Sequence, residues 1–357
     1  MKLIKDYEIY FSRAVSAFCL FLLLAEANVW LNTLDNTILV LGYRLFILTT
    51  PFFFLLFNYR LTFVAFVLAI IGLLFWLWHH YLIGTILIAL GLAVSGYMLK
   101  YYAAFSTKGA ARNKIALNIG SILSGVAILL TQNKVLLIFL CIIFLLFSLT
   151  SFFLYYKNIA TKKLPISKQH FTLKGLFTFR GLAWIIIGYI IGVKLIAIVS
   201  ILPQFLIQSN HGILPHWYGW MLILNCLIVV VLQLPVMRLI DKWEKLTALI
   251  PLIFGMLIVA SSPFISITTF WGAFSWTFAL SLVECTISYL DKLSQDEHCL
   301  LLKESAVGIG SALTVYAIRA FSPETGSLVI GLGSLVLLSI SIVLFFMEKQ
   351  FQLSTKQ

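Results

Sequence analysis

Twelve apolar stretches separated by short polar breaks constrain the fold of this 357-residue chain more than any other feature. A helix that crosses a bilayer needs about 20 apolar residues. With 61% hydrophobic and 11% charged residues, the chain leaves no room for a sizeable soluble domain. The sequence therefore predicts an all-α integral membrane protein with twelve transmembrane helices. The stretches cover residues 10–31, 38–57, 61–78, 81–103, 114–131, 135–156, 181–207, 217–238, 246–263, 269–290, 304–321 and 327–347.

The basic residues gather in every second loop. All but four of the 25 Lys and Arg residues lie on one predicted side of the membrane. The exceptions are Lys134, in an opposite-side loop, and Arg44, Lys194 and Arg319, within helices. By the positive-inside rule, both termini are predicted to be cytoplasmic and the protein to lie in the cell inner (plasma) membrane. This placement explains the net charge of +12 without a nucleic-acid partner.

Two short sequence motifs in the first half of the chain recur at nearly the same spacing in the second half. IGSILS at 119–124 returns as IGSALT at 309–314, and YMLK at 97–100 returns as YLDK at 289–292. Such repeats are typical of secondary transporters that rock two similar bundles around a central site. The longest polar segment, residues 157–180, lies between the first six apolar stretches and the last six. We therefore predict an N-terminal bundle over 1–156, a basic cytoplasmic linker over 157–180 and a C-terminal bundle over 181–357.

Residues 218–245 contain YGW, an Asn, a Gln-x-Pro, Arg238 and the turn DKWEK. Together with the topology, this segment resembles the major facilitator superfamily, in particular its twelve-helix exporters. The resemblance implies alternating access and a cytoplasmic latch built from Asp241, Lys242 and Arg238. In the first half, the corresponding loop is reduced to Asn-Tyr-Arg at 58–60, without an Asp.

Five of the ionisable side chains within the predicted helices are candidates for a functional role. Each costs at least about 2.5 to 3.5 kcal/mol at a helix centre, so each needs a partner or a function. Glu26 and Arg44 either form a static ion pair, or Glu26 carries a proton or contacts substrate. Glu284 either carries a proton or pairs with a cytoplasmic Lys or a hydroxyl. Arg319 lies near a helix end and is predicted to extend to the interface. The fifth is Lys194.

Lys194 is the deepest of the five and has no acidic partner on its own helix. It is predicted to face a central cavity and bind a negatively charged substrate, and the alternative is an ion pair with Glu284 or Glu26. Pro203 removes a backbone donor from the same helix and permits a bend. The other candidate substrate-binding residues are Arg44, Asn225, Gln204 and Tyr189.

The sequence contains no Walker A, HExxH or GxSxG motif, and its five cysteines are scattered. We predict no enzyme activity, no cofactor and no metal. The predicted function is monomeric, proton-coupled transport of a small anionic or zwitterionic metabolite, such as a carboxylate siderophore. Glu26 or Glu284 is the predicted proton carrier, membrane lipid is the other partner, and export is slightly favoured. The alternatives are a multidrug/H+ antiporter, an importer of a nutrient or metal chelate, and a non-transporting receptor of this fold.

Overall fold

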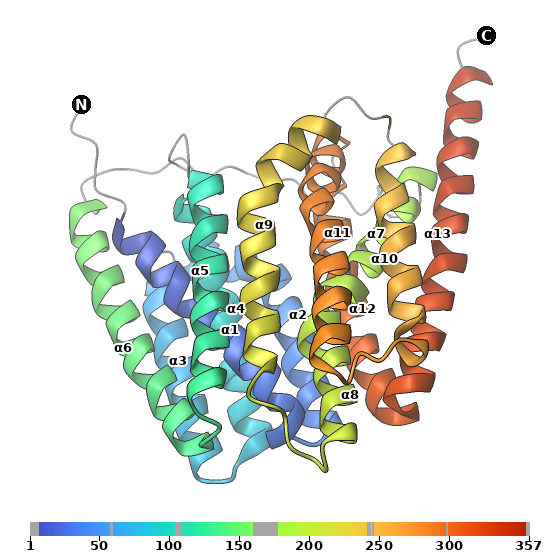
Figure 1. Cartoon of the computed structure of the whole chain (residues 1–357). Coiled ribbons are helices and arrows are strands. Elements are labelled where there is room, and N and C mark those ends of the chain that lie inside the picture. Colours follow the sequence, from blue (N-terminus) through green and yellow to red (C-terminus); the bar gives the residue numbers. More distant parts are fainter. Residues whose placement is uncertain are drawn as a thin grey trace. The chain divides into compact units, whose positions relative to one another are not determined.

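The computed structural model describes residues 7–57, 60–103, 109–159, 178–240, 244, 246–297 and 299–354 (Figure 1). In the first half, the helices are α1 (Tyr7–Trp30), α2 (Thr33–Phe57), α3 (Arg60–Leu77), α4 (Tyr81–Ala103), α5 (Gly109–Leu130) and α6 (Lys134–Ile159). In the second half they are α7 (Phe179–Ile196), η2 (Ala197–Ile201), α8 (Leu202–Ser209), α9 (Tyr218–Ile240), η3 (Thr247–Leu249), α10 (Ile250–Ala260), η4 (Ser262–Phe264), α11 (Phe270–Asp296), α12 (Leu300–Phe321) and α13 (Pro323–Ser354).

Each predicted apolar stretch corresponds to one helical segment, because α7, η2 and α8 form a continuous helix. Eight of the described helices are long and apolar enough to cross a bilayer, judged by length and composition, while α9 and α10 have shorter apolar parts. The predicted all-α membrane fold with twelve helices is thus confirmed.

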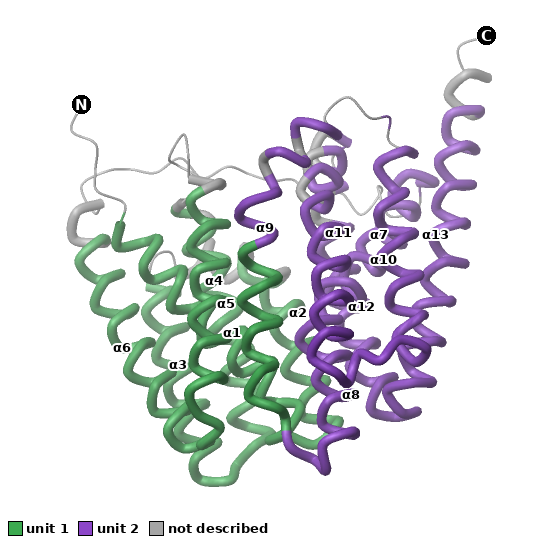
Figure 2. The backbone as a smooth tube through the Cα atoms, viewed as in Figure 1, with its two compact units in different colours: residues 1–167, 214–227 green, residues 168–213, 228–357 purple. Residues whose placement is uncertain are grey.

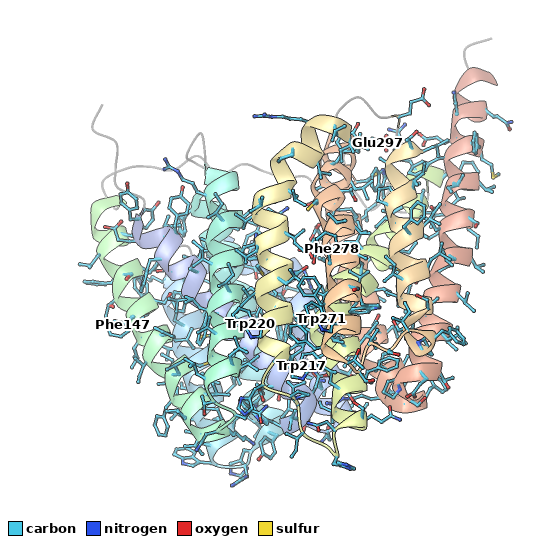
Figure 3. The ribbon with its side chains drawn as sticks, in the orientation of Figure 1. Phe147, Trp217, Trp220, Trp271, Phe278 and Glu297 are labelled. Atoms are coloured by element: carbon cyan, nitrogen blue, oxygen red, sulfur yellow. The ribbon has the colours of Figure 1, made fainter. Side chains whose placement is uncertain are left out.

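Large apolar side chains cover the outer surface of the helices. Phe147, Trp220, Trp271 and Phe278, labelled in Figure 3, are 56%, 53%, 72% and 41% exposed. A water-soluble protein rarely exposes so many contiguous apolar side chains. This surface is therefore suited to lipid, and the helices need no strong amphipathic pattern to fold.

The chain divides into two compact units (Figure 2). Unit 1 contains residues 1–167 together with 214–227, and unit 2 contains 168–213 and 228–357. The first part of α9 thus packs with unit 1 and the rest with unit 2. The predicted bundles over 1–156 and 181–357 and the linker between them stay a prediction, and residues 160–177 of that linker lie outside the described part of the chain.

The two halves use the same helix contact at equivalent places. In unit 1, a Cβ added at Gly120 of α5 would lie 2.7 Å from the Cβ of Ala17 in α1. In unit 2, a Cβ added at Gly310 of α12 would lie 2.8 Å from the carbonyl carbon of Tyr189 in α7. In both units, therefore, the fifth helix of the half packs on the first through the glycine of the recurring IGS motif. This equivalence supports an internal repeat.

Candidate functional site

Lys194 and Glu284 form an ion pair between α7 and α11 of unit 2. The ammonium of Lys194 donates to Oε2 of Glu284. Lys194 is fully buried, and the side chain of Glu284 is 19% exposed. Of the two arrangements expected for Lys194, the structure therefore shows the pair with Glu284. In this state the carboxylate compensates the ammonium, so the positive charge predicted for a central cavity is neutralised here.

The continuous helix that carries Lys194 changes from α to π geometry shortly after it, at Ala197. Ala197–Ile201 forms a π-helical turn, in which the N–H of Leu202 bonds to the carbonyl of Ala197. Pro203 follows within the first turn of α8. In a regular α-helix, the proline ring would clash with the carbonyl four residues earlier, and the wider π turn relieves this contact. The sequence predicted a bend at Pro203, and the structure has this π turn beside it.

Close packing against α12 fixes the position of Lys194 in α7. A Cβ added at Gly192 would lie 2.9 Å from the backbone nitrogen of Ser311. The hydroxyl of Ser311 donates to the Gly192 carbonyl at 3.1 Å. One turn earlier, a Cβ added at Gly188 would lie 2.9 Å from the Cα of Lys303. Gly188 and Gly192 have the Gly-x-x-x-Gly spacing that lets membrane helices approach closely, a signal that the sequence analysis overlooked.

Unit 1 contains a buried carboxyl in α1. Glu26 is 3% exposed, and within the described residues its Oε1 has no hydrogen-bond partner. The static ion pair considered between Glu26 and Arg44 is not formed in the part of the chain that the structure describes. Arg44 instead places its guanidinium 5.6 Å from the ring centroid of Tyr43.

Arg13 is a buried cation that the sequence analysis assigned to the cytoplasmic flank. It lies inside α1, is 6% exposed, and its Nη1 lies 3.4 Å from the carbonyl of Gly96 in α4. Its Nε has no hydrogen-bond partner among the described residues. Arg13 interacts electrostatically with Tyr43 and is repelled by Arg44. The predicted stretch over 10–31 already included Arg13 near its start, and because the observed helix begins earlier, at Tyr7, Arg13 lies deeper than a flanking residue.

The remaining candidates occupy varied positions. Gln204 in α8 and Tyr189 in α7 are half-buried in unit 2, and Asn225 is half-buried in the part of α9 that belongs to unit 1. Arg238 is exposed in the last turn of α9. The other two residues of the expected latch, Asp241 and Lys242, lie outside the described residues.

The structure adds two ionic clusters in unit 2 that the sequence did not reveal. Nε of Arg180 donates to Glu348 at 2.6 Å, and the same nitrogen lies 3.8 Å from Glu297. Glu297 also accepts from the indole of Trp184 at 2.6 Å. In the second cluster, the fully buried Lys303 pairs with Asp291 of α11 and with Glu304. These clusters join the ends of α7, α11, α12 and α13.

Comparison with solved structures connects this arrangement to a known fold. A POT family transporter in complex with a thioalcohol-conjugated peptide aligns over 96% of both chains, with a TM-score of 0.72 and 13% identity. The peptide transporter POT in complex with sulfate aligns over 96% of this chain and 94% of its own, with a TM-score of 0.70 and 13% identity. The chain has a major facilitator fold.

A third similar structure is a POT family transporter in complex with 5-aminolevulinic acid, with a TM-score of 0.67, 12% identity, and 94% and 95% of the two chains covered. At these identities the likeness establishes the fold alone. The expected closer resemblance to exporters is not confirmed by these structures. No protein-family model and no curated protein matches the sequence.

Proposed function

We propose that this protein is a proton-coupled secondary transporter of a small solute that carries a carboxylate or another anionic group. The observation that carries the proposal is the ion pair between Lys194 and Glu284 inside a major facilitator fold. Ionisable groups in transmembrane helices are costly and mark ion or substrate pathways. A pair in the middle of a helix that contains a π turn is well placed for coupling.

The chemistry of the pair couples proton and anion. When Glu284 takes up a proton, its negative charge disappears and the buried ammonium of Lys194 loses its compensation. An unpaired buried charge is strongly destabilising, by about 3 to 5 kcal/mol in soluble proteins. An anionic group on the solute removes this cost by replacing the carboxylate. Proton and anion therefore bind together, and their departure restores the pair.

Because the proton and the solute bind together at the pair of Lys194 and Glu284, they cross the membrane in the same direction. Under an inward proton gradient the solute then moves inward, so the mechanism favours uptake over the export expected from the sequence. The similar structures support the solute class, because two of them hold sulfate and 5-aminolevulinic acid. A small anion or zwitterion therefore ranks above a carboxylate siderophore, which stays a candidate in the same assay.

Unit 1 supplies a second candidate anchor for the anionic group. Arg13 is buried and forms no ion pair within the described residues, and Arg44 lies near enough to repel it. Two neighbouring guanidinium groups are stabilised by an anion that contacts both. Glu26, also buried without an ion pair in the described part of the chain, remains the candidate proton carrier of this unit.

Uptake into proteoliposomes under an imposed pH gradient tests the proposal. Labelled 5-aminolevulinate, a dipeptide, sulfate and citrate are the solutes to compare. Wild-type protein should accumulate at least one of them only when the gradient is present. Glu284→Gln mimics the protonated pair, so it should lose accumulation but retain exchange of labelled for unlabelled solute. Lys194→Gln should lose both gradient-driven accumulation and exchange.

The exposed Lys100 provides the matched control, since Lys100→Gln removes a helical lysine that lies at the surface of the described structure. This variant should transport like the wild type. Gradient-driven accumulation by Glu284→Gln would contradict coupling at the pair. Transport of cationic dyes with no anion transport would replace the proposal with the multidrug alternative.

A further inference from the structure

The predicted outer end of unit 1 carries a basic residue that departs from the distribution of the others. Lys134 is the first residue of α6 and belongs to a loop predicted to face the outside, where lysine is disfavoured. The turn between α3 and α4 lies at the same end of this unit (Figure 1). The proposed transport function gives Lys134 no role, so an explanation has to come from the side chains around it.

Two aromatic side chains contact the ammonium of Lys134. Its Nζ lies 4.4 Å from the ring centroid of Tyr81, the first residue of α4, and 5.7 Å from that of Trp30, the last residue of α1. It also donates to the Tyr81 hydroxyl at 2.9 Å. An ammonium has three donors, and no carboxylate pairs with Lys134 in the part of the chain that the structure describes. The cation is therefore held in one position with donors left over.

His79 extends this arrangement by one hydrogen bond. Its Nδ1 lies 2.9 Å from the Tyr81 hydroxyl. Because this hydroxyl accepts from Lys134, its own hydrogen is available to Nδ1, which leaves the hydrogen of a neutral histidine ring on Nε2. His79 is exposed in the turn after α3. Lys134, Tyr81 and His79, which we call the outer cluster, thus form a chain of hydrogen bonds with a donor at each end.

The backbone at His79 is in the left-handed region, with a φ of 62°. A residue other than glycine uncommonly adopts this conformation, whereas glycine adopts it at no steric cost. Such conformations persist where the surrounding structure enforces them, and they gather at ligand-binding sites. A histidine at this position therefore indicates a use for its side chain.

Exposed apolar side chains surround the outer cluster. Trp78 and Leu82 flank it in the turn and in α4, and Val135 and Leu136 follow Lys134 in α6. Tryptophan and tyrosine concentrate at the membrane interface, at the level of the lipid headgroups. The donors of the cluster consequently lie where a headgroup phosphate adjoins the acyl chains, and phosphate oxygens are strong acceptors for such donors.

We propose that the outer cluster binds the phosphate of an anionic phospholipid in the leaflet at this end of unit 1. Lys134 and Nε2 of His79 donate to the phosphate oxygens, Tyr81 positions both donors, and the acyl chains lie along the exposed apolar side chains. Basic pockets between transmembrane helices bind anionic headgroups in this way. A lipid whose headgroup carries a cation is disfavoured, because that cation would lie near Lys134. The site lies within unit 1 and does not depend on the proposed transport function.

Photo-crosslinking in lipid nanodiscs tests the proposal on the purified full-length protein. The probe is phosphatidylglycerol with a diazirine in its headgroup, and peptide mass spectrometry locates the crosslinks. They should include residues 77–83 and 132–137. Unlabelled phosphatidylglycerol should compete at these two segments at least about fivefold more effectively than phosphatidylcholine. Inorganic phosphate should not compete, because it lacks the acyl chains.

Charge substitutions show whether Lys134 carries the binding. Lys134→Gln should reduce crosslinking at the two segments about tenfold, the effect of one charge-assisted hydrogen bond. Lys134→Arg keeps the charge and should keep most of the crosslinking. The matched control is Lys100→Gln, which removes an exposed lysine from the last turn of α4 and should leave crosslinking at the two segments unchanged.

Glycine substitutions separate binding from stability. His79→Gly relieves the left-handed backbone, so the midpoint of thermal unfolding should stay equal or rise while crosslinking falls about two- to tenfold. His211 has a φ of 52° in another exposed turn, and His211→Gly relieves the backbone there in the same way. This control should leave crosslinking at the outer cluster unchanged.

Equal crosslinking of the wild type and Lys134→Gln at the two segments, with both proteins monodisperse, would overturn the proposal. So would an equal loss in Lys100→Gln, which would indicate a general effect of charge. Equal competition by phosphatidylcholine would indicate an aromatic belt without a headgroup site, and equal competition by inorganic phosphate would indicate a site for a free anion. Either result would also overturn it. Crosslinking as expected in a protein that moves no solute would retain this inference and remove the proposed function.

Discussion

Removing one partner of the pair between Lys194 and Glu284 should destabilise the protein more than removing both. Glu284→Gln leaves a fully buried ammonium without its carboxylate. Breaking a buried pair costs about 3 to 5 kcal/mol. This loss of stability has an upper limit, because the Lys194 ammonium can instead release its proton. For an ordinary lysine at pH 7 that release costs about 4.6 kcal/mol. We therefore expect a loss of about 3 to 4 kcal/mol in the free energy of unfolding.

Lys194→Met should cost less than this, because the remaining carboxyl of Glu284 is 19% exposed and can be hydrated. The double variant Lys194→Met, Glu284→Gln leaves no charge, so its free energy of unfolding should lie within about 1 kcal/mol of the wild type. The wild type, the two single variants and the double variant form a double-mutant cycle. Its coupling energy should reach at least about 2 kcal/mol, as found for residues in direct contact.

Reversible unfolding in mixed detergent micelles, followed by tryptophan fluorescence, measures the four free energies. The loss in Glu284→Gln should also shrink by about 1.4 kcal/mol per pH unit above neutrality, wherever the folded state holds the lysine unprotonated. If Glu284→Gln is as stable as the wild type, or if the single effects add up to that of the double variant, the ion pair has no energetic role and the reasoning fails.

Three further predictions concern packing, topology and the second anion anchor. Gly192→Ala should lower the free energy of unfolding by about 1 to 3 kcal/mol through overpacking against α12. The control Gly333→Ala should leave it unchanged, and equal midpoints of thermal unfolding for the two variants would contradict the close contact. A reporter fused after Lys163 should behave as cytoplasmic and one near Asn210 as external, and the opposite result would reject the predicted orientation. Arg13→Gln should weaken solute binding about tenfold, the loss of one charge-assisted hydrogen bond, and unchanged affinity in a binding titration would remove Arg13 from the site.

The sequence predicted the helices well because a membrane imposes their length and spacing directly. The boundaries of α4, predicted as 81–103, are those observed, and α5 and α6 begin within a few residues of their predicted starts. Charge placement in the loops separated neighbouring spans that apolarity alone would have merged. The recurrence of IGS also located an equivalent contact in both halves, since a glycine fits where backbones approach closely.

Partner choice was less predictable, because it depends on the rotation of each helix about its axis. A helix that contacts lipid on one side and protein on the other is apolar all round. Its sequence pattern therefore does not indicate which side packs against the other helices. The partners of Lys194 therefore stayed open between Glu284 and Glu26. The same limitation hid the pair between Lys303 and Asp291, because both residues were placed in cytoplasmic segments near predicted helix ends.

The two units differ in how they compensate buried charge. In unit 2, Lys194 and Lys303 each contact a carboxylate of α11, so their cost is offset within the protein. In unit 1, Arg13 and Glu26 are also buried but form no ion pair among the described residues. The shared packing of the two halves does not require this asymmetry, since both pack their first and fifth helices through the glycine of the same motif. Under the proposed function, a proton on Glu26 and an anion at Arg13 supply compensation in unit 1. Both are species that a proton-coupled transporter of anions would supply in each cycle.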